Sequence, residues 1–188
     1  MSERNKSRLV VDASVAKGSN DRMFNPMSDL PGDLNRQCLI AIREEKHVAV
    51  FNSQLEVEWS NHASPFAKRW LGDMVGKEKV LQEEGEQFRE LESPARAALG
   101  SDEERNALSK DFHLVRSAMA TDRIIVSNER RFPAFLVRAS EAVIELRELH
   151  YASPLHDGDA CRLWIKSGAR RVAIRKVAAW IAKGGSSD

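Results

Sequence analysis

Short apolar strands separated by helical segments constrain the fold of this chain more than any other feature. Three runs are apolar throughout: residues 9–11, Val48–Phe51 and Ile124–Val126. Strands without polar alternation are typical of a sheet that is covered on both faces. Strands that alternate with helices imply parallel pairing. We therefore expect an α/β fold of three layers, α/β/α, with a central parallel sheet.

Capping residues and apolar periodicity predict where the helices lie. Helix starts are indicated at Asp33, at Asn52 or Ser53, at Ser64 ahead of Pro65, and at Ser101, which matches a capping box with Glu104. The charged segment 76–100 is weakly periodic, and we expect an exposed helical arm there. Further expectations are a loop at 19–33, a turn at 130–133, helices at 139–149, 160–167 and 170–182, and an edge strand at 150–152.

Length and composition indicate one globular domain with an appendage. The chain has 188 residues, of which 42% are hydrophobic and 30% charged, and its net charge is only +1. We expect a domain at residues 1–157, then a basic helical extension and flexible tail at 158–188. No apolar run approaches the roughly 18 residues of a membrane helix, so a cytoplasmic protein is expected. Cys38 and Cys161 form no CxxC pair, which suggests neither a zinc site nor a disulfide framework.

Four carboxylates follow strands or sit on helices that begin near the same sheet edge. Asp12 and Glu129 come just after the first and third apolar strands, and Asp111 shares a helix face with Leu114. The fourth is Glu58, on the face of Leu55, with Glu56 as the alternative. Alone, each could be a helix cap or an exposed loop residue. In a right-handed parallel sheet, however, the strand ends and the following helix starts share one edge, so the four acids could converge.

A converging carboxylate cluster needs a cation, because like charges repel one another. Ligand sets made only of oxygen favour Mg²⁺ or Mn²⁺ over zinc. Such ions can bind a phosphodiester and activate a water molecule. Metal-dependent phosphodiester hydrolysis is therefore the reaction we expect.

The order of these motifs resembles that of the PIN-domain nucleases, which include the VapC-type toxins. Residues 9–16 are similar to the family's opening strand, where an aspartate is followed two residues later by Ser or Thr, here Asp12 and Ser14. Residues 52–59, 111–118 and 125–129 are similar to its other three motifs. The resemblance implies a PIN-like fold and an endoribonuclease whose catalytic, metal-binding residues are Asp12, Glu58, Asp111 and Glu129, supported by Ser14, Ser127 and Asn128. The fourth acid departs from the more usual Asp, and segment 60–109 is longer than in compact toxins.

Charge reversal toward the C-terminus suggests a basic face for RNA, which would be the substrate. Its candidate nucleic-acid contacts are Arg162, Lys166, Arg170, Arg171, Arg175 and Lys176. An antitoxin protein and a second copy of the chain are further candidate partners, and no membrane is expected. The rival hypothesis is a silent PIN-like scaffold that binds RNA or protein. His113 and the four tryptophans are interpreted as surface, packing or core residues.

Overall fold

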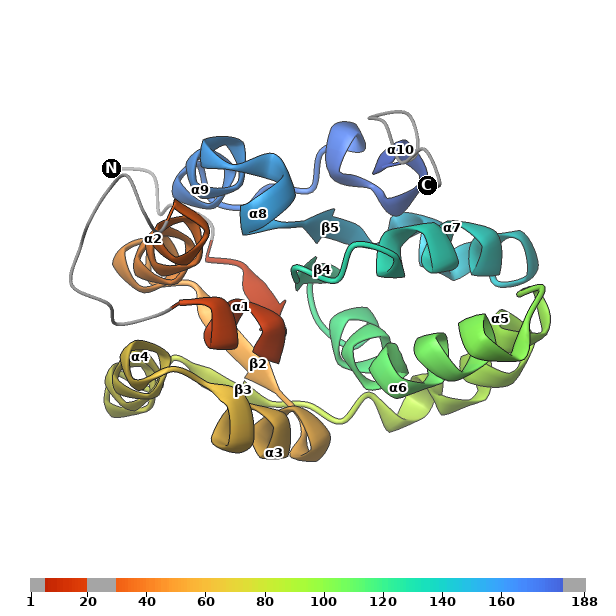
Figure 1. Ribbon diagram of the computed structural model, residues 1–188, viewed down its shortest axis with the longest axis horizontal. Helices are drawn as coiled ribbons and strands as arrows, with labels where there is room; N and C mark the ends of the chain where they lie inside the picture. Colours follow the sequence, from red (N-terminus) through yellow and green to blue (C-terminus); the bar gives the residue numbers. More distant parts are fainter. Residues whose placement is uncertain (1–5, 20–29, 181–188) are drawn as a thin grey trace.

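The computed structural model describes residues 6–19 and 30–180. Its centre is a five-stranded sheet in which every pairing is parallel, in the order β3-β2-β1-β4-β5 (Figure 1). The strands are β1 (Arg8–Val11), β2 (Val48–Phe51), β3 (Val80–Gln82), β4 (Ile124–Val126) and β5 (His150–Ala152). The α/β class predicted from the sequence is confirmed.

The central strand β1 lies where the winding of the sheet reverses. Val10 is in register with Val50 of β2 on one side and with Ile125 of β4 on the other. The chain therefore proceeds outward from β1 through β2 to β3, and then crosses back to β4 and β5. Ligands of open α/β sheets bind beyond the carboxyl ends of the strands at such a switch point. Here that point lies between the ends of β1 and β4.

Helices cover both faces of the sheet. The longer ones are α2 (Leu30–Glu44), α3 (Ser53–His62), α4 (Pro65–Gly76), α6 (Asp102–Met119), α7 (Phe132–Ala142) and α9 (Asp159–Lys166). The short ones are α1 (Ala13–Gly18), α5 (Glu92–Ala97), α8 (Pro154–Asp157) and α10 (Val177–Trp180), with 3-10 turns η1 (Glu86–Leu91), η2 (Ile144–Glu148) and η3 (Ala173–Arg175). Helix α2 packs with α4 and α9 in one layer, and α6 packs with α7 and against β1, β2 and β4 in the other (Figure 1).

Three of the predicted helix caps are confirmed by their hydrogen bonds. The side chains of Asn52, Ser64 and Ser101 accept the backbone N–H groups of residues three positions later, at the starts of α3, α4 and α6. The prediction for Asp33 is wrong, because α2 begins at Leu30 and places Asp33 in its first turn.

Segment 76–100 differs most from the sequence expectation. It contains the edge strand β3, η1 and α5 rather than one helical arm. Two other boundaries were also wrong. Helix α7 begins at Phe132, inside the predicted turn, and ends before the predicted helix 139–149 would. The predicted helix 170–182 is replaced, as far as Trp180, by η3 and the short α10.

The described part of the C-terminal extension is packed into the same core as the sheet. Cys161, Ile165 and Val177 are buried in that core. The Ser7 hydroxyl, just ahead of β1, donates a 2.9 Å hydrogen bond to the carbonyl of Gly168. Residues 158–180 are therefore structurally continuous with the preceding domain. The predicted flexible tail beyond residue 180 and residues 20–29 of the predicted loop lie outside the described residues.

Within residues 6–19 and 30–180, none of the helices combines the length and the apolar character that crossing a membrane requires.

Candidate active site

The carboxylate of Asp12 is fixed at the end of the central strand. Its backbone N–H donates to the carbonyl of Val126 at 3.0 Å, which extends the β1–β4 ladder by one bond. The hydroxyls of Ser14 and Ser127 both donate to Oδ2 of Asp12, the latter at 2.6 Å. Asp12 is only 6% exposed. These bonds compensate for the burial of its charge and fix the direction of the carboxylate.

Asn128 links the loops around this carboxylate. Its backbone N–H donates to Ser14 Oγ at 3.0 Å, and its side-chain amide donates to Asn35 Oδ1 at 2.8 Å. Its side-chain oxygen accepts from Ser153 Oγ at 3.2 Å. Residues following β1, β4 and β5 are thus held together with α2. This arrangement supports the predicted accessory positions of Ser14, Ser127 and Asn128.

Asp111 faces Asp12 from the opposite layer. Burial, and then the negative charge of Asp12, raise the pKa of Asp111 to about 6, with Glu129 contributing in the same direction. Three of the four predicted acids therefore lie close enough to affect one another. The expected position of Asp111 near a helix start is wrong, since α6 begins at Asp102 and Ser101 supplies its cap.

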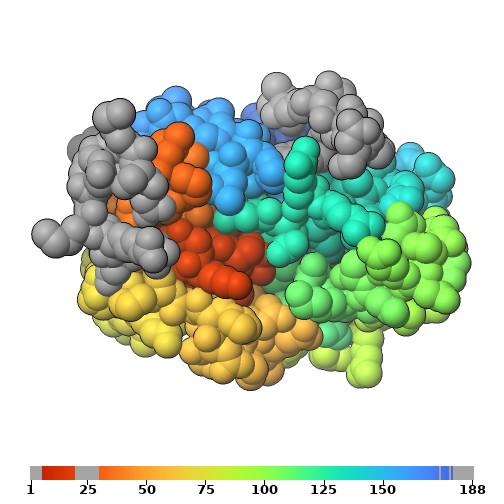
Figure 2. Space-filling view, in the orientation of Figure 1, coloured from red at the N-terminus to blue at the C-terminus, as the bar shows by residue number. Residues whose placement is uncertain are grey.

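Tyr151 lies beneath the acids and was missed by the sequence analysis. It is buried, it is in register with Ile125, and its hydroxyl donates to the carbonyl of Glu129 at 2.9 Å. Burial raises its pKa well above the ordinary value; a hydrogen bond with Ser127 opposes this shift, and the charges of the three acids add to it. Glu129 itself is exposed at the rim. In Figure 2, α1 reaches the surface between α3, α6 and the segment that follows β4.

Glu58 is held by His113. Its Oε1 lies 3.5 Å from His113 Nε2, and the imidazole Nδ1 lies 3.1 Å from Asn52 Oδ1. Asn52 Oδ1 also accepts the N–H of Leu55, so it is an acceptor and Nδ1 of His113 is the donor. Burial raises the pKa of Glu58, but the neighbouring His113 and a hydrogen bond from Gln54 lower it by more, so the net shift is downward.

The choice between the two candidate glutamates of α3 favours Glu58. Glu58 is partly buried, whereas Glu56 is exposed and accepts a hydrogen bond from Gln82 of β3. His113 was expected at the surface or in packing. It is buried, and it contacts a candidate site residue. Spacing along the sequence could not show that α3, which carries Glu58, packs beside the helix that carries His113.

The donor chemistry of the cluster fits a hard divalent cation. Carboxylate oxygens are the ligands that Mg²⁺ and Mn²⁺ prefer. The raised pKa of Asp111 reflects the unfavourable proximity of like charges that such an ion would relieve. Across the described ranges, no three His, Cys, Asp or Glu side chains already stand as one ligand group. Asp12 and Asp111 are the acids that would hold such an ion, with Glu129 close enough to add its charge.

The predicted basic face is not assembled as expected. Arg175 is 6% exposed, forms an ion pair with Asp157 and stacks on the Trp164 ring, so its predicted outward orientation is wrong. Ion pairs also engage three other candidates: Arg162 with Asp159, Lys166 with Glu44 and Lys176 with Glu148. Arg170 and Arg171 are exposed. Four of the six basic candidates therefore form ion pairs within the protein.

The tryptophans with described side chains lie in the core or pack on it, as predicted. Trp59 and Trp70 are 1% exposed, and the indole of Trp59 donates to the carbonyl of Val11 at 2.9 Å, beneath Asp12. Trp164 is 8% exposed. The indoles of Trp59 and Trp70 contact one another in the core, and neither offers an exposed surface for base stacking.

The chain matches no family model, no curated protein and no solved structure.

Proposed function

We propose that this protein is a PIN-like, metal-dependent endoribonuclease. The observation that carries the proposal is the meeting of Asp12, Asp111 and Glu129 at the switch point of the sheet, where mutual repulsion and burial raise the pKa of Asp111 to about 6. Perturbed carboxylates at this location are typical of functional sites. The order of the four acidic motifs along the sequence adds support.

Each polar residue has a separate task in this proposal. Asp12, oriented by Ser14 and Ser127, is the fixed ligand, and Asp111 faces it from α6. Bound Mg²⁺ or Mn²⁺ would supply an activated water and neutralise charge on the phosphodiester. Glu58 contacts His113, whose Nε2 lies 3.5 Å from its Oε1, and is not assigned as a fixed ligand. Glu129 lies at the rim, where its charge contributes to the field without burial.

The finer parts of the proposal rest on the motif resemblance alone. These are the preference for RNA over DNA, an antitoxin protein as partner and association with a second copy of the chain. A nuclease without any toxin role would have the same acidic cluster. A small reading frame next to the gene would support the toxin assignment.

The decisive test is cleavage of single-stranded RNA by purified protein with Mn²⁺. Cleavage should stop with excess chelator and in Asp12→Asn. Asp159→Asn is the matched control, because Asp159 has a side chain that is 72% exposed and lies outside the acidic cluster. Cleavage that persists in Asp12→Asn or in chelator would assign the activity to another site or to a contaminant.

A silent scaffold is the second candidate function. The contact of Glu58 with His113 favours it, because this glutamate then has an internal neighbour on α6 without any metal. If wild-type protein never cleaves RNA and Mn²⁺ leaves its melting temperature unchanged, the scaffold replaces the nuclease.

A further inference from the structure

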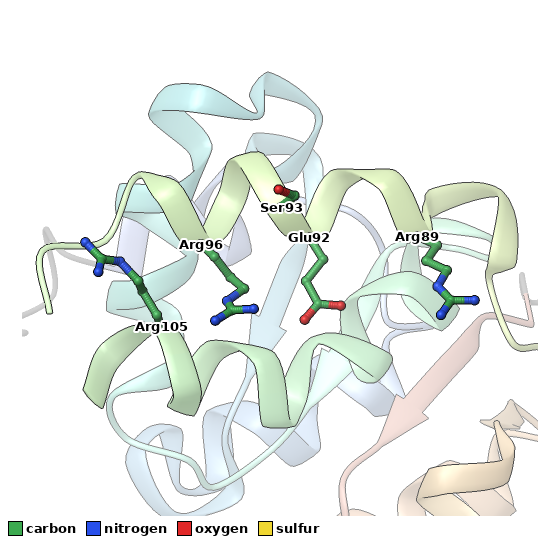
Figure 3. Close-up of a pocket in the computed structure, with 5 residues that line it drawn as sticks. All are labelled: Arg89, Glu92, Ser93, Arg96 and Arg105. Atoms are coloured by element: carbon green, nitrogen blue, oxygen red, sulfur yellow. The ribbon is translucent and has the colours of Figure 1, made fainter. Parts of the chain in front are cut away.

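A cavity of about 340 Å³ lies where the η1–α5 segment meets the start of α6 (Figure 3). Its lining residues are Arg89, Glu92, Ser93, Arg96 and Arg105, none of which belongs to the acidic cluster. Figure 3 places Arg89 and Arg105 at opposite ends, with Arg96 between them. Three arginines against one glutamate give this lining an excess of positive charge.

The central arginine has no partner in the described part of the protein. Its Nε is buried without a hydrogen bond, and Glu92, one helical turn earlier, does not reach it as an ion pair. Arg89 lies 3.7 Å from Glu86, and its side chain is 76% exposed. Arg105 donates to Asp102 at 2.8 Å. Arg96 and Arg89 therefore retain donors for a ligand.

Three further buried polar atoms of α6 have no hydrogen-bond partner within the described ranges: Ser109 Oγ, His113 Nε2 and Arg116 Nε. Both α5 and η1 pack against α6. Buried polar atoms are nearly always satisfied by protein, water or ligand, and leaving one unsatisfied costs about 1–3 kcal/mol. This helix interface is therefore suited to a polar occupant.

Ion pairs neutralise most of the acidic side chains around the cavity. Arg116 contacts Glu86 at 3.2 Å, and Arg138 contacts Glu104 at 2.7 Å. Arg131 contacts Glu103 at 2.9 Å. Of the three lining arginines, Arg105 pairs with Asp102 and Arg89 lies near Glu86, which leaves Arg96 without an acidic partner among the described residues. Glu92 is the one acid that faces the cavity itself.

We propose that this cavity binds a phosphate group, with Arg96 as its principal ligand and Arg89 and Arg105 at its ends. The planar guanidinium fork matches phosphate oxygens in pairs. The volume exceeds the roughly 30 Å³ share of one water molecule by a wide margin, which leaves room for an anion. The phosphate could belong to a free nucleotide or to an RNA backbone. The inference does not depend on the proposed nuclease activity.

Calorimetric titration of the whole protein in chelator tests this site with two probes, pyrophosphate and an uncleavable 2′-O-methyl oligoribonucleotide. Arg96→Gln should weaken binding by about tenfold or more, the scale of one charge-assisted hydrogen bond. Arg43→Gln, on an arginine of α2 that pairs with Asp73 outside both the cavity and the predicted basic face, should stay within about twofold. Tighter binding of pyrophosphate would assign a free ligand, and tighter binding of the oligonucleotide would assign the backbone.

Two additional variants keep the test decisive. Arg89→Gln alters a mostly exposed side chain, so it should fold even if Arg96→Gln does not, and it should also weaken binding. Arg147→Gln, on an exposed arginine outside the cavity, the acidic cluster and the predicted basic face, should bind both probes as wild type does. The proposal is overturned if wild type binds neither probe, or if loss of Arg96 or Arg89 leaves affinity unchanged in folded protein.

Discussion

The hydroxyl of Ser127 donates a 2.6 Å hydrogen bond to Oδ2 of Asp12, although the two residues are 115 positions apart in the chain. The bond joins the ends of β1 and β4 across the switch point. Together with the Ser14 hydroxyl, it determines which way the Asp12 carboxylate points. The free oxygen of that carboxylate is then directed by the fold and not by local sequence.

Asp12→Asn should relieve the repulsion on Asp111. The amide oxygen can still accept both serine hydroxyls, so folding should be retained. The pKa of Asp111 should fall from about 6 toward its ordinary value of 3.8, because the charge of Asp12 helps to raise it. A carboxyl ¹³C titration by NMR measures this shift. RNA cleavage should drop by roughly 10²-fold or more, the scale of losing one transition-state stabiliser.

Asp111 should make the protein less stable as pH rises from about 4 to about 6. Its pKa is about 6 in the folded state against an ordinary 3.8, so the folded state binds the extra proton in that window. The stability difference is roughly 2–3 kcal/mol. Asp111→Asn should match wild type near pH 4 and exceed it at pH 7. Chemical denaturation across this range checks the prediction, and a pH-independent difference would contradict it.

Gly85→Ala should destabilise the fold by about 2 kcal/mol or more. Gly85 has φ +64°, and a Cβ there would overlap the backbone carbonyl of Arg116. Gly72→Ala is the control, since nothing lies within 4 Å of its Cβ position and α4 favours alanine by about 1 kcal/mol. Thermal melts should move in opposite directions. Equal shifts would show that the packing of η1 against α6 is wrong.

Arg175→Ala should cost about 3–5 kcal/mol, because the Asp157 carboxylate, whose side chain is 9% exposed, then keeps only the backbone N–H of Ser153 as its partner. It also removes the contact with the Trp164 ring. Arg162→Ala breaks only an exposed pair and should change stability by less than about 1 kcal/mol. Denaturation midpoints compare the two variants. If both variants lose less than about 1 kcal/mol of stability, Arg175 lies at the surface, as first expected.

The strands and capped helices were readable because their signals are local. Residues 9–11 and Ile124–Val126 are wholly apolar, and Ser101 and Asn52 carry caps that act within three residues. Strand β3 was missed because it is short, only partly buried and lies at the sheet edge, where apolar residues are not required. Its pairing with β2 depends on the tertiary fold and has no signal in the local sequence.

The positions of Asp12 and Glu129 were predictable from strand ends, but the surroundings of the acids were not. The register of β5 with β4 brings Tyr151 to the site, and the packing of α3 beside α6 brings His113 next to Glu58. Neither relationship has a spacing along the chain that reveals it. Arg175 was misplaced for the same reason, since its partners Asp157 and Trp164 are brought to it by the fold of residues 153–177 and not by a continuous helix.

The crossing of the chain from β3 back to β4 also bears on when the acidic cluster can form during synthesis. Strand β4 pairs with β1 only after more than half of the chain has been made. Contacts of such long range form late and slow folding. A nascent chain that ends before β4 holds Asp12 without Ser127 and Glu129. The complete cluster therefore requires synthesis to pass Glu129, and translation products that end before β4 should lack it.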